Sequence, residues 1–267
     1  MTIERAALNR TIADVDDSDA YECRPHRAGE IRDALVGRRL TGAFRRGKSI
    51  WCDTSGFGRA ATPGPALGVH LGMSGRILVT DAAGKLTEGG DWVGGRYGRD
   101  GEQPTRKAIW DRFTIVFADG GSLRLFDKRR LGRVRLDPDI DALGPDAELV
   151  TLRGFRVAIG PSTAPIKARL LDQSVIAGVG NLLADETLWQ ARISPRRRCN
   201  DLAPDDVATL HRSLHRATKA AIRNGGVHTG TIIAFRHVGA QCPRCGIEMT
   251  RATVGSRTTW WCPKEQV

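Results

Sequence analysis

The stretch from Gln173 to Glu186, QSVIAGVGNLLADE, decides how the second half of this chain folds. The residues before it predict a helix that runs to Asp172, and its small residues and two glycines predict tight turns. A new helix is expected to start near Asn181, where free backbone N–H groups would suit a phosphate. The same glycines would also suit a closely packed turn between helices, so the pattern leaves a phosphate site and a packing turn both open.

Helical periodicity continues on both sides of this stretch. Segments 166–171, 182–190 and 205–223 repeat their apolar residues at helical spacing. The last one has two aspartates near its start and Arg223 at its end, and the Asn-Gly-Gly that follows is a stop signal. The second half is therefore predicted to be mainly helical.

The first half is predicted to be mainly β-structure. Segments 113–117 and 122–126 flank Ala-Asp-Gly-Gly, which is typical of a hairpin. Segment 45–52 is predicted to be a basic loop that leads into a strand, and further strands are expected at 67–71, 75–79 and 133–136. The acidic run 14–19 and the long segments 54–65 and 81–105 are predicted to be surface loops.

Composition limits the class of protein. The chain has 267 residues, of which 40% are hydrophobic and 27% charged, as in soluble globular proteins. It lacks an apolar run of about 18 to 20 residues, the length of a membrane span, and its start lacks a signal-peptide pattern, so we expect a cytoplasmic protein. The formal net charge of +11 predicts attraction to nucleic acid, although an arginine-rich composition alone also produces it.

Three of the six cysteines cluster near the end of the chain. Cys242 and Cys245 are separated by two residues, and Cys262 follows after sixteen more. A zinc ribbon of this spacing would place its fourth cysteine at position 265, where the chain has Glu265. The spacing by itself leaves a metal site and three structural thiols both open. The other three cysteines, Cys23, Cys52 and Cys199, are expected to be buried thiols.

Five segments in order resemble the formamidopyrimidine-DNA glycosylase / endonuclease VIII family. They are Arg46–Lys48, His70–Gly75, Asp127–Arg133, Gln173–Glu186 and Val254–Thr259, and the likeness extends along nearly the whole chain. The resemblance implies an α+β fold, with an N-terminal β-sandwich flanked by helices and then a helix–two-turns–helix domain with a C-terminal zinc ribbon. The expected boundaries are 1–137, 138–236 and 237–267.

The resemblance also implies a function and a partner. It implies base-excision DNA repair by an N-glycosylase that acts on oxidised bases and has abasic-site lyase activity. The partner would be damaged double-stranded DNA, bound by a monomer associated with the nucleoid in the bacterial cytoplasm. The alternative is a protein of the same fold that binds damaged DNA without cutting it.

Individual residues match the family's functional positions. Lys48 would lie near the sugar, and Met73 would fill the gap left by a flipped base. Arg129 would contact the orphaned opposite base, and Leu131 would be an aliphatic wedge where the family often has Phe. The remaining DNA-contacting matches are Arg112, Lys167, Asn181 and Arg257. Without the resemblance, Lys48 would be interpreted as one basic residue of a solvated loop, and a methionine in a turn such as Met73 as part of the core. Arg112 could equally be an exposed strand residue.

Both ends of the sequence depart from the family pattern. The family uses an N-terminal proline amine as nucleophile with an adjacent glutamate, whereas this chain begins Met1-Thr2-Ile3-Glu4. Three hypotheses follow: a start upstream of Met1, a replacement amine at Thr2 (after removal of Met1) or Lys48, or DNA binding without catalysis. In the second hypothesis the only nearby carboxyl in the sequence is Glu4, which is not adjacent to the Thr2 amine. Mass spectrometry of the native N-terminus tests the first.

At the other end, the resemblance implies one structural zinc ion bound by Cys242, Cys245 and Cys262. Zinc also accepts a carboxylate oxygen, so Glu265 is the predicted fourth ligand, and His237 is the alternative.

Overall fold

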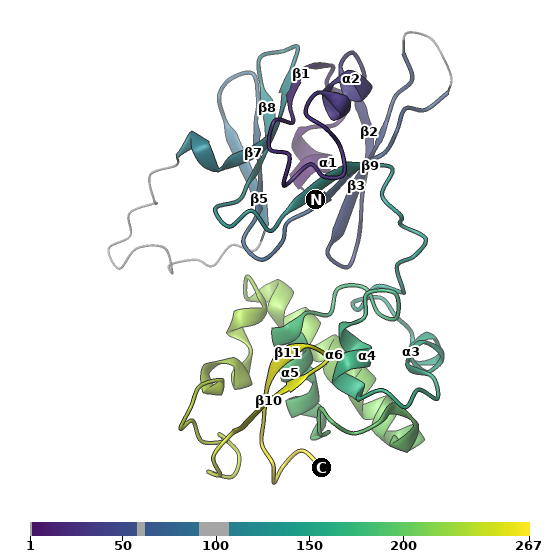
Figure 1. The fold of residues 1–267 in the computed structure, drawn as a ribbon, viewed down its shortest axis with the longest axis vertical. Coiled ribbons are helices and arrows are strands. Elements are labelled where there is room, and N and C mark those ends of the chain that lie inside the picture. Colours follow the sequence, from purple (N-terminus) through teal and green to yellow (C-terminus); the bar gives the residue numbers. More distant parts are fainter. Residues whose placement is uncertain (1, 58–61, 91–106) are drawn as a thin grey trace. The chain divides into compact units, whose positions relative to one another are not determined.

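The computed structural model describes residues 2–57, 62–90 and 107–267, and the chain divides into two compact units, Met1–Ile140 and Asp141–Val267 (Figure 1). Parts of two predicted loops, 58–61 and 91–105, lie outside the described residues. Within the part of the chain that is described, none of the helices combines the length and the apolarity that crossing a membrane requires. The three-part division at 137 and 236 stays a prediction.

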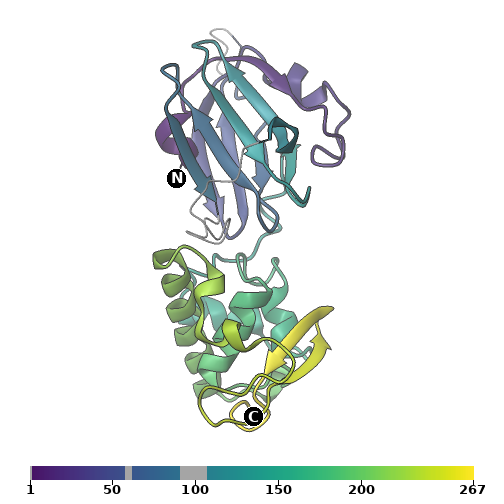
Figure 2. The same cartoon turned by 90° about the vertical axis from the view of Figure 1, so that its left-hand side faces the viewer.

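The first unit consists of two antiparallel sheets. Its strands are β1 (Ile12–Asp16), β2 (Leu40–Arg46), β3 (Ser49–Thr54), β4 (Leu67–His70), β5 (Arg76–Thr80), β6 (Leu86–Gly90), β7 (Asp111–Phe117), β8 (Ser122–Phe126) and β9 (Arg133–Leu136). One sheet has the order β1-β7-β8-β5-β6 and the other β2-β3-β4-β9. Figure 2 shows this sandwich in the first unit. Alternate residues such as Phe113, Ile115 and Phe117 of β7 fill the core that both sheets share. Strands β7 and β8 pair as antiparallel neighbours, which confirms the predicted hairpin.

Helices complete the first unit. They are α1 (Thr2–Ala6), α2 (Glu30–Leu35) and the 3-10 turn η1 (Ala108–Trp110). Helix α1 packs on β2, β5 and β6, where Ile3 and Ala7 enter the core.

Two predicted loops are wrong in part. The acidic run 14–19 includes the end of β1, and Asp17 is buried because its carboxylate accepts the N–H groups of Gly29, Ile31 and Arg32 at the start of α2. A capping carboxylate of this kind cannot be told from a solvated one by local pattern. Residues 86–90 form β6, an edge strand on β5, although Leu86-Thr-Glu-Gly-Gly has weak strand propensity.

The second unit is helical with a small hairpin. Its helices are α3 (Leu152–Ile159), α4 (Ile166–Leu171), α5 (Asn181–Ala191) and α6 (Pro204–Arg223), with the 3-10 turns η2 (Cys199–Asp201), η3 (Val227–Thr229) and η4 (Thr231–Phe235). Strands β10 (Thr250–Val254) and β11 (Arg257–Trp261) pair as a two-stranded ribbon. One apolar core joins the helices, and a second joins Trp189 and Ile232 to Trp260 and Cys262 of the ribbon. The predicted α+β class is confirmed, and so are the bounds predicted for α4.

Candidate nucleic-acid interface

Strand register gathers three turns at one end of the first unit. β3 pairs with β4 so that Ser49 faces His70, and β4 pairs with β9 so that His70 faces Arg133. In the other sheet, Arg76 of β5 faces Phe126 of β8. The turns from β2 to β3, from β4 to β5 and from β8 to β9 therefore share this end, which we call the turn end.

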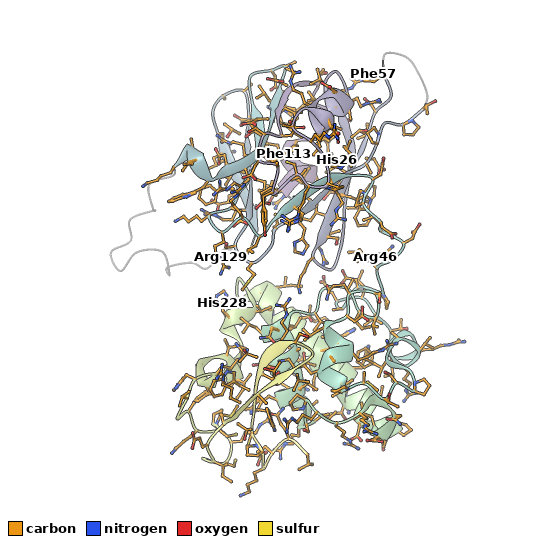
Figure 3. The ribbon with its side chains drawn as sticks, viewed as in Figure 1. His26, Arg46, Phe57, Phe113, Arg129 and His228 are labelled. Atoms are coloured by element: carbon orange, nitrogen blue, oxygen red, sulfur yellow. The ribbon has the colours of Figure 1, made fainter. Side chains whose placement is uncertain are left out.

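Four predicted site residues lie on these three turns. Lys48 is exposed on the β2–β3 turn, and Met73 is 68% exposed on the β4–β5 turn. Arg129 is exposed and Leu131 is 40% exposed on the β8–β9 turn. Figure 3 labels Arg129 at this end of the unit. Exposed methionine and leucine beside cations form a surface that suits bases and phosphates together.

The Met73 turn is packed against its neighbour. Gly72 has a φ of +62°, and a Cβ there would lie 2.6 Å from the carbonyl oxygen of Leu131, so only glycine fits. The Gly72 N–H donates to Nδ1 of His70 at 3.0 Å. Burial, and then the charge of Lys48, lowers the pKa of His70, which favours the neutral ring that this hydrogen bond requires. The turn thus holds Met73 out into solvent.

Asp127 organises the β8–β9 turn. Its buried carboxylate accepts the N–H groups of Arg129, Leu131 and Gly132 at 3.0, 2.8 and 2.9 Å. It also accepts the hydroxyl of Ser74 at 3.2 Å, which ties this turn to the Met73 turn. Arg129 donates from Nε to the same hydroxyl at 3.1 Å. One carboxylate therefore sets the geometry of both turns.

Arg112 is mostly buried beneath the β8–β9 turn, unlike the exposed residues on the turns themselves. Its Nε donates to the carbonyl of Asp127 at 2.8 Å, and its Nη1 lies 3.6 Å from the Asp19 carboxylate. The side chain is only 15% exposed. The DNA contact predicted for Arg112 stays a prediction, while its bracing of the Asp127 turn is observed.

The predicted catalytic residues at the start of the chain lie on α1. The Thr2 hydroxyl donates to the Glu88 carbonyl at 3.4 Å, and Glu4 is exposed. Gly89 accommodates Thr2, since a Cβ at Gly89 would lie 2.1 Å from the Thr2 hydroxyl oxygen. Gly89 pairs with Ile77 near the start of β5, so the beginning of α1 is also at the turn end. The roles of Thr2 and Glu4 stay predictions.

In the second unit, Gln173 holds the turns between α4 and α5. Its amide Nε2 donates to the carbonyls of Leu171 and Val179, each at 2.9 Å. Its Oε1 accepts the N–H of Gly178, whose φ is +106°. These contacts aim the start of α5 and the Asn181 side chain toward the ribbon.

Lys167 is fully buried, which its sequence context did not indicate. Its ammonium lies 2.6 Å from Oδ1 of Asp185, whose side chain is also fully buried, and it donates to the Thr259 hydroxyl at 2.7 Å. Nε of Arg236 donates to the other oxygen of Asp185 at 2.8 Å. The phosphate contact predicted for Lys167 stays a prediction, because in this structure the Lys167 ammonium is buried and paired with Asp185.

The ribbon tip is fastened to the same network. The amide of Asn181 donates to the Thr258 carbonyl at 2.9 Å, and Arg236 donates to that carbonyl at 3.3 Å. Gly255 lies against α4, because a Cβ there would be 2.9 Å from Cα of Ala168. Arg257 is exposed at the tip, where its guanidinium is available to a polyanion.

The three clustered cysteines meet in space. The sulfur atoms of Cys242, Cys245 and Cys262 all lie within 4.8 Å of one another, which fits three thiolate ligands of one tetrahedral metal ion. The Glu265 N–H donates to the Cys262 sulfur at 3.3 Å, as expected of a metal-binding turn. Burial opposes ionisation of Cys242, but the N–H groups of Arg244 and Cys245 outweigh it and lower its pKa. The donor set therefore fits a structural zinc ion.

The fourth ligand is not in this cluster. Glu265 pairs with Arg192 at 2.9 Å, and Nδ1 of His237, an exposed residue, lies 3.0 Å from the Val238 carbonyl. Among the described residues, neither joins the group formed by the three sulfur atoms. The fourth ligand stays a prediction.

Comparison with known sequences now decides the family. The sequence model of the formamidopyrimidine-DNA glycosylase N-terminal domain matches residues 1–134, and that of the H2TH domain of the same enzyme matches residues 142–232. The formamidopyrimidine-DNA glycosylase of Roseiflexus sp. is 32% identical over 259 residues, which cover 89% of this chain and 85% of that protein. This chain belongs to the formamidopyrimidine-DNA glycosylase family.

Further relatives support this family assignment. The Streptomyces coelicolor formamidopyrimidine-DNA glycosylase is 30% identical and covers 99% of this chain and 93% of its own length. Solved structures of Lactococcus lactis Fpg with abasic-site DNA, and of MutM with DNA containing carbocyclic 8-oxo-G, superpose with a TM-score of 0.73. Each is 25% identical, and each match covers 99% of this chain and 95% of the other.

Sequence reasoning missed three residues that organise this member of the glycosylase family. They are Asp127, Gln173 and Asp185, which lie inside the family motifs Asp127–Arg133 and Gln173–Glu186. Their roles depend on partners that only folding brings close. One local signal was present, because an aspartate or glutamine next to glycine-rich turns often accepts backbone N–H groups.

Proposed function

We propose that this protein is a DNA glycosylase of base-excision repair, which removes oxidised bases from duplex DNA and cleaves the strand at the resulting abasic site. The observation that carries the proposal is the turn end, where Lys48, Met73, Arg129 and Leu131 lie together in a chain of this family. The relatives' structures contain DNA with an abasic site or an oxidised base analogue. The family also favours a glycosylase over a protein that binds damaged DNA without cutting it.

In this proposal the exposed apolar side chains enter the base stack. Met73 fills the space of a flipped base, and Leu131 acts as a second wedge beside Arg129, which contacts the opposite base. In the second unit, Asn181 and Arg257 contact phosphates, and these contacts hold the register of the DNA without reading the lesion. Lys167, which is buried against Asp185, holds the ribbon that presents Arg257. The net charge of +11 adds a salt-dependent attraction.

The chemistry needs an amine of this chain. An amine attacks C1′ of the damaged nucleotide, the base departs with a proton, and the sugar remains as a Schiff base that permits strand cleavage. Lys48 supplies the positive charge or proton near the sugar. The predicted nucleophile is the α-amine that removal of Met1 exposes at Thr2, and Glu4 is the predicted acid–base residue. A free α-amine has an ordinary pKa of about 7.7–8.0, so part of it is unprotonated at neutral pH.

The test uses duplexes that contain one 8-oxoguanine or one abasic site. We expect strand cleavage of both, a covalent adduct after borohydride reduction, and a peptide map that identifies the amine. Lys48→Met should lower cleavage by about a hundredfold or more. Lys85→Met is the matched control, because Lys85 is exposed on the β5–β6 turn at the opposite end of the unit. Tight binding of either duplex without cleavage or adduct would support the non-catalytic alternative instead.

We also propose that the cysteine cluster binds one structural zinc ion, with Glu265 as the fourth ligand. The ion would hold the Cys242–Cys245 turn to the end of β11 and so stabilise the ribbon that presents Arg257. Because Glu265 adjoins the Cys262 sulfur through its own N–H, a rotation of its side chain away from Arg192 would bring the carboxylate toward the site. Zinc supplies structural cross-linking here and no step of the reaction.

Metal analysis and cobalt substitution test the zinc proposal. We expect one zinc ion per chain, and a Co²⁺ spectrum with the charge-transfer intensity of three thiolates. Glu265→Ala should weaken metal binding by about tenfold or more, while His237→Ala should leave it unchanged. The reverse pattern would assign the fourth position to His237, and no effect of either change would exclude both residues.

A further inference from the structure

Glu22 is a buried acid for which the proposed reaction has no use. It lies between β1 and α2 and is fully buried. Neither of its carboxylate oxygens has a hydrogen-bond partner among the described residues. Buried polar groups are nearly always paired, so an unpaired carboxyl calls for a physical explanation.

The surroundings of Glu22 are the turn end. Its Oε2 would lie only 2.6 Å from a Cβ placed on Gly132, the last residue that Asp127 holds through its N–H. The Glu22 carbonyl accepts the N–H of Val134 at 2.9 Å, so its backbone is anchored to the start of β9. Glu22 therefore lies directly behind the β8–β9 turn.

The charged groups that face Glu22 come from three elements. Asp127 follows β8, Arg112 comes from β7, and Asp19 belongs to the same segment as Glu22. Arg130 of the turn pairs with Asp19 at 2.6 Å, and the Cys23 thiol, next along the chain, has a pKa raised to about 12 by burial. Two acids and one arginine thus dominate the field at Glu22.

This field favours the protonated acid. Burial, followed by the charges of Asp127 and Asp19, raises the pKa of Glu22 to about 7, against smaller opposing effects of Arg112 and of the nearby Gly132 N–H. Asp127 accepts four hydrogen bonds from its turns, which suits an ionised carboxylate. Two adjacent buried carboxyls do not readily ionise together, so Glu22 is the one that keeps its proton.

We propose that protonated Glu22 is a positioning residue for DNA binding, because its neutrality lets Asp127 hold the β8–β9 turn and the Met73 turn in the binding geometry. Ionised Glu22 would repel the carboxylate of Asp127, which is also fully buried, and so weaken the hydrogen bonds that Asp127 accepts from the N–H groups of Arg129 and Leu131. The link from Asp127 to Ser74 carries the same disturbance to Met73. This inference rests on the proposed function, since it assumes that these turns contact DNA.

The experiment compares the affinity of the wild-type protein and Glu22→Gln for a duplex with a tetrahydrofuran abasic analogue, from about pH 6 to about pH 9 at constant ionic strength. Glutamine is neutral at every pH and similar in shape. We expect equal Kd values near pH 6 and a wild-type Kd about tenfold higher than that of Glu22→Gln near pH 9, which corresponds to a pKa change of one unit on binding. His70 and other titrating groups are common to both proteins and cancel in the ratio.

Two further variants keep the result interpretable. Glu22→Met, also neutral, should show the same pH dependence as Glu22→Gln, and Glu248→Gln, an exposed glutamate of the second unit, should follow the wild type. Parallel profiles for the wild type and Glu22→Gln would overturn the inference, as would weak binding of both folded neutral variants near pH 6. Failure of the wild type to bind the duplex at any pH would instead refute the proposed function.

Discussion

The buried ion pair of the second unit makes the sharpest prediction about stability. Lys167 and Asp185 have fully buried side chains 2.6 Å apart, and Arg236, 14% exposed, donates to the second oxygen of Asp185. Burial raises the pKa of Asp185 and lowers that of Lys167, so each charge depends on its partners for compensation. The perturbation is Asp185→Asn, which removes the carboxylate that both cations contact.

The magnitude follows from what each variant leaves unpaired. Breaking a buried ion pair by removing one partner costs about 3–5 kcal/mol. Asp185→Asn leaves a buried ammonium and a nearly buried guanidinium without a counter-charge, so we expect the upper end, about 5 kcal/mol. Lys167→Met leaves Asp185 with Arg236 and fills the volume, so we expect about 3 kcal/mol or less.

Urea unfolding measures these free energies. With a slope of about 1–3 kcal/mol per molar, Asp185→Asn should lower the midpoint by more than about 1 M. Because the chain has two compact units, only the transition of the second unit should move. Lys219→Met, an exposed lysine on α6, is the control and should change the free energy of unfolding by less than about 0.5 kcal/mol.

The double variant Lys167→Met with Asp185→Asn tests whether the two side chains stabilise the fold as a pair. Removing both partners should cost less than the sum of the single variants, because the second change relieves the charge that the first exposed. Additive effects, or a Lys167→Met protein that is destabilised more than Asp185→Asn, would show that the pair is not the source of the stability.

Three more predictions follow from single residues. Met73→Ala should leave the thermal midpoint unchanged, because Met73 is 68% exposed, and should weaken binding to abasic-site DNA by about tenfold; equal affinity would argue against a wedge. Asp17→Ala should lower the free energy of unfolding by about 1–3 kcal/mol, since it removes the acceptor of three N–H groups at the start of α2; an unchanged thermal midpoint would contradict this. The wild type should lose about 3 kcal/mol of its free energy of unfolding as pH rises from about 4.5 to about 7, because Glu22 ionises in the unfolded chain before it ionises in the folded one. Denaturant titrations of Glu22→Gln should lack this loss. Identical pH profiles for the two proteins would refute the prediction.

Local patterns in the sequence determined the elements and the family. The hairpin of β7 and β8 follows from alternating apolar residues around a glycine turn, and α4 follows from helical spacing, because both depend on neighbours in the chain. The family motifs include Met73 and Arg129, and in the structure both side chains are exposed on turns.

Only the tertiary structure decided which charges are internal. From the sequence, Lys167 would be expected to be one more exposed cation in an arginine-rich chain. In the structure it is buried, where it forms an ion pair with Asp185, eighteen residues away, and donates a hydrogen bond to Thr259 of the ribbon. Glu22 and Asp127 come together from opposite ends of the first unit's sequence. Burial and pairing are properties of contacts between distant segments, and they change the protonation and role of a side chain without changing the local pattern that surrounds it.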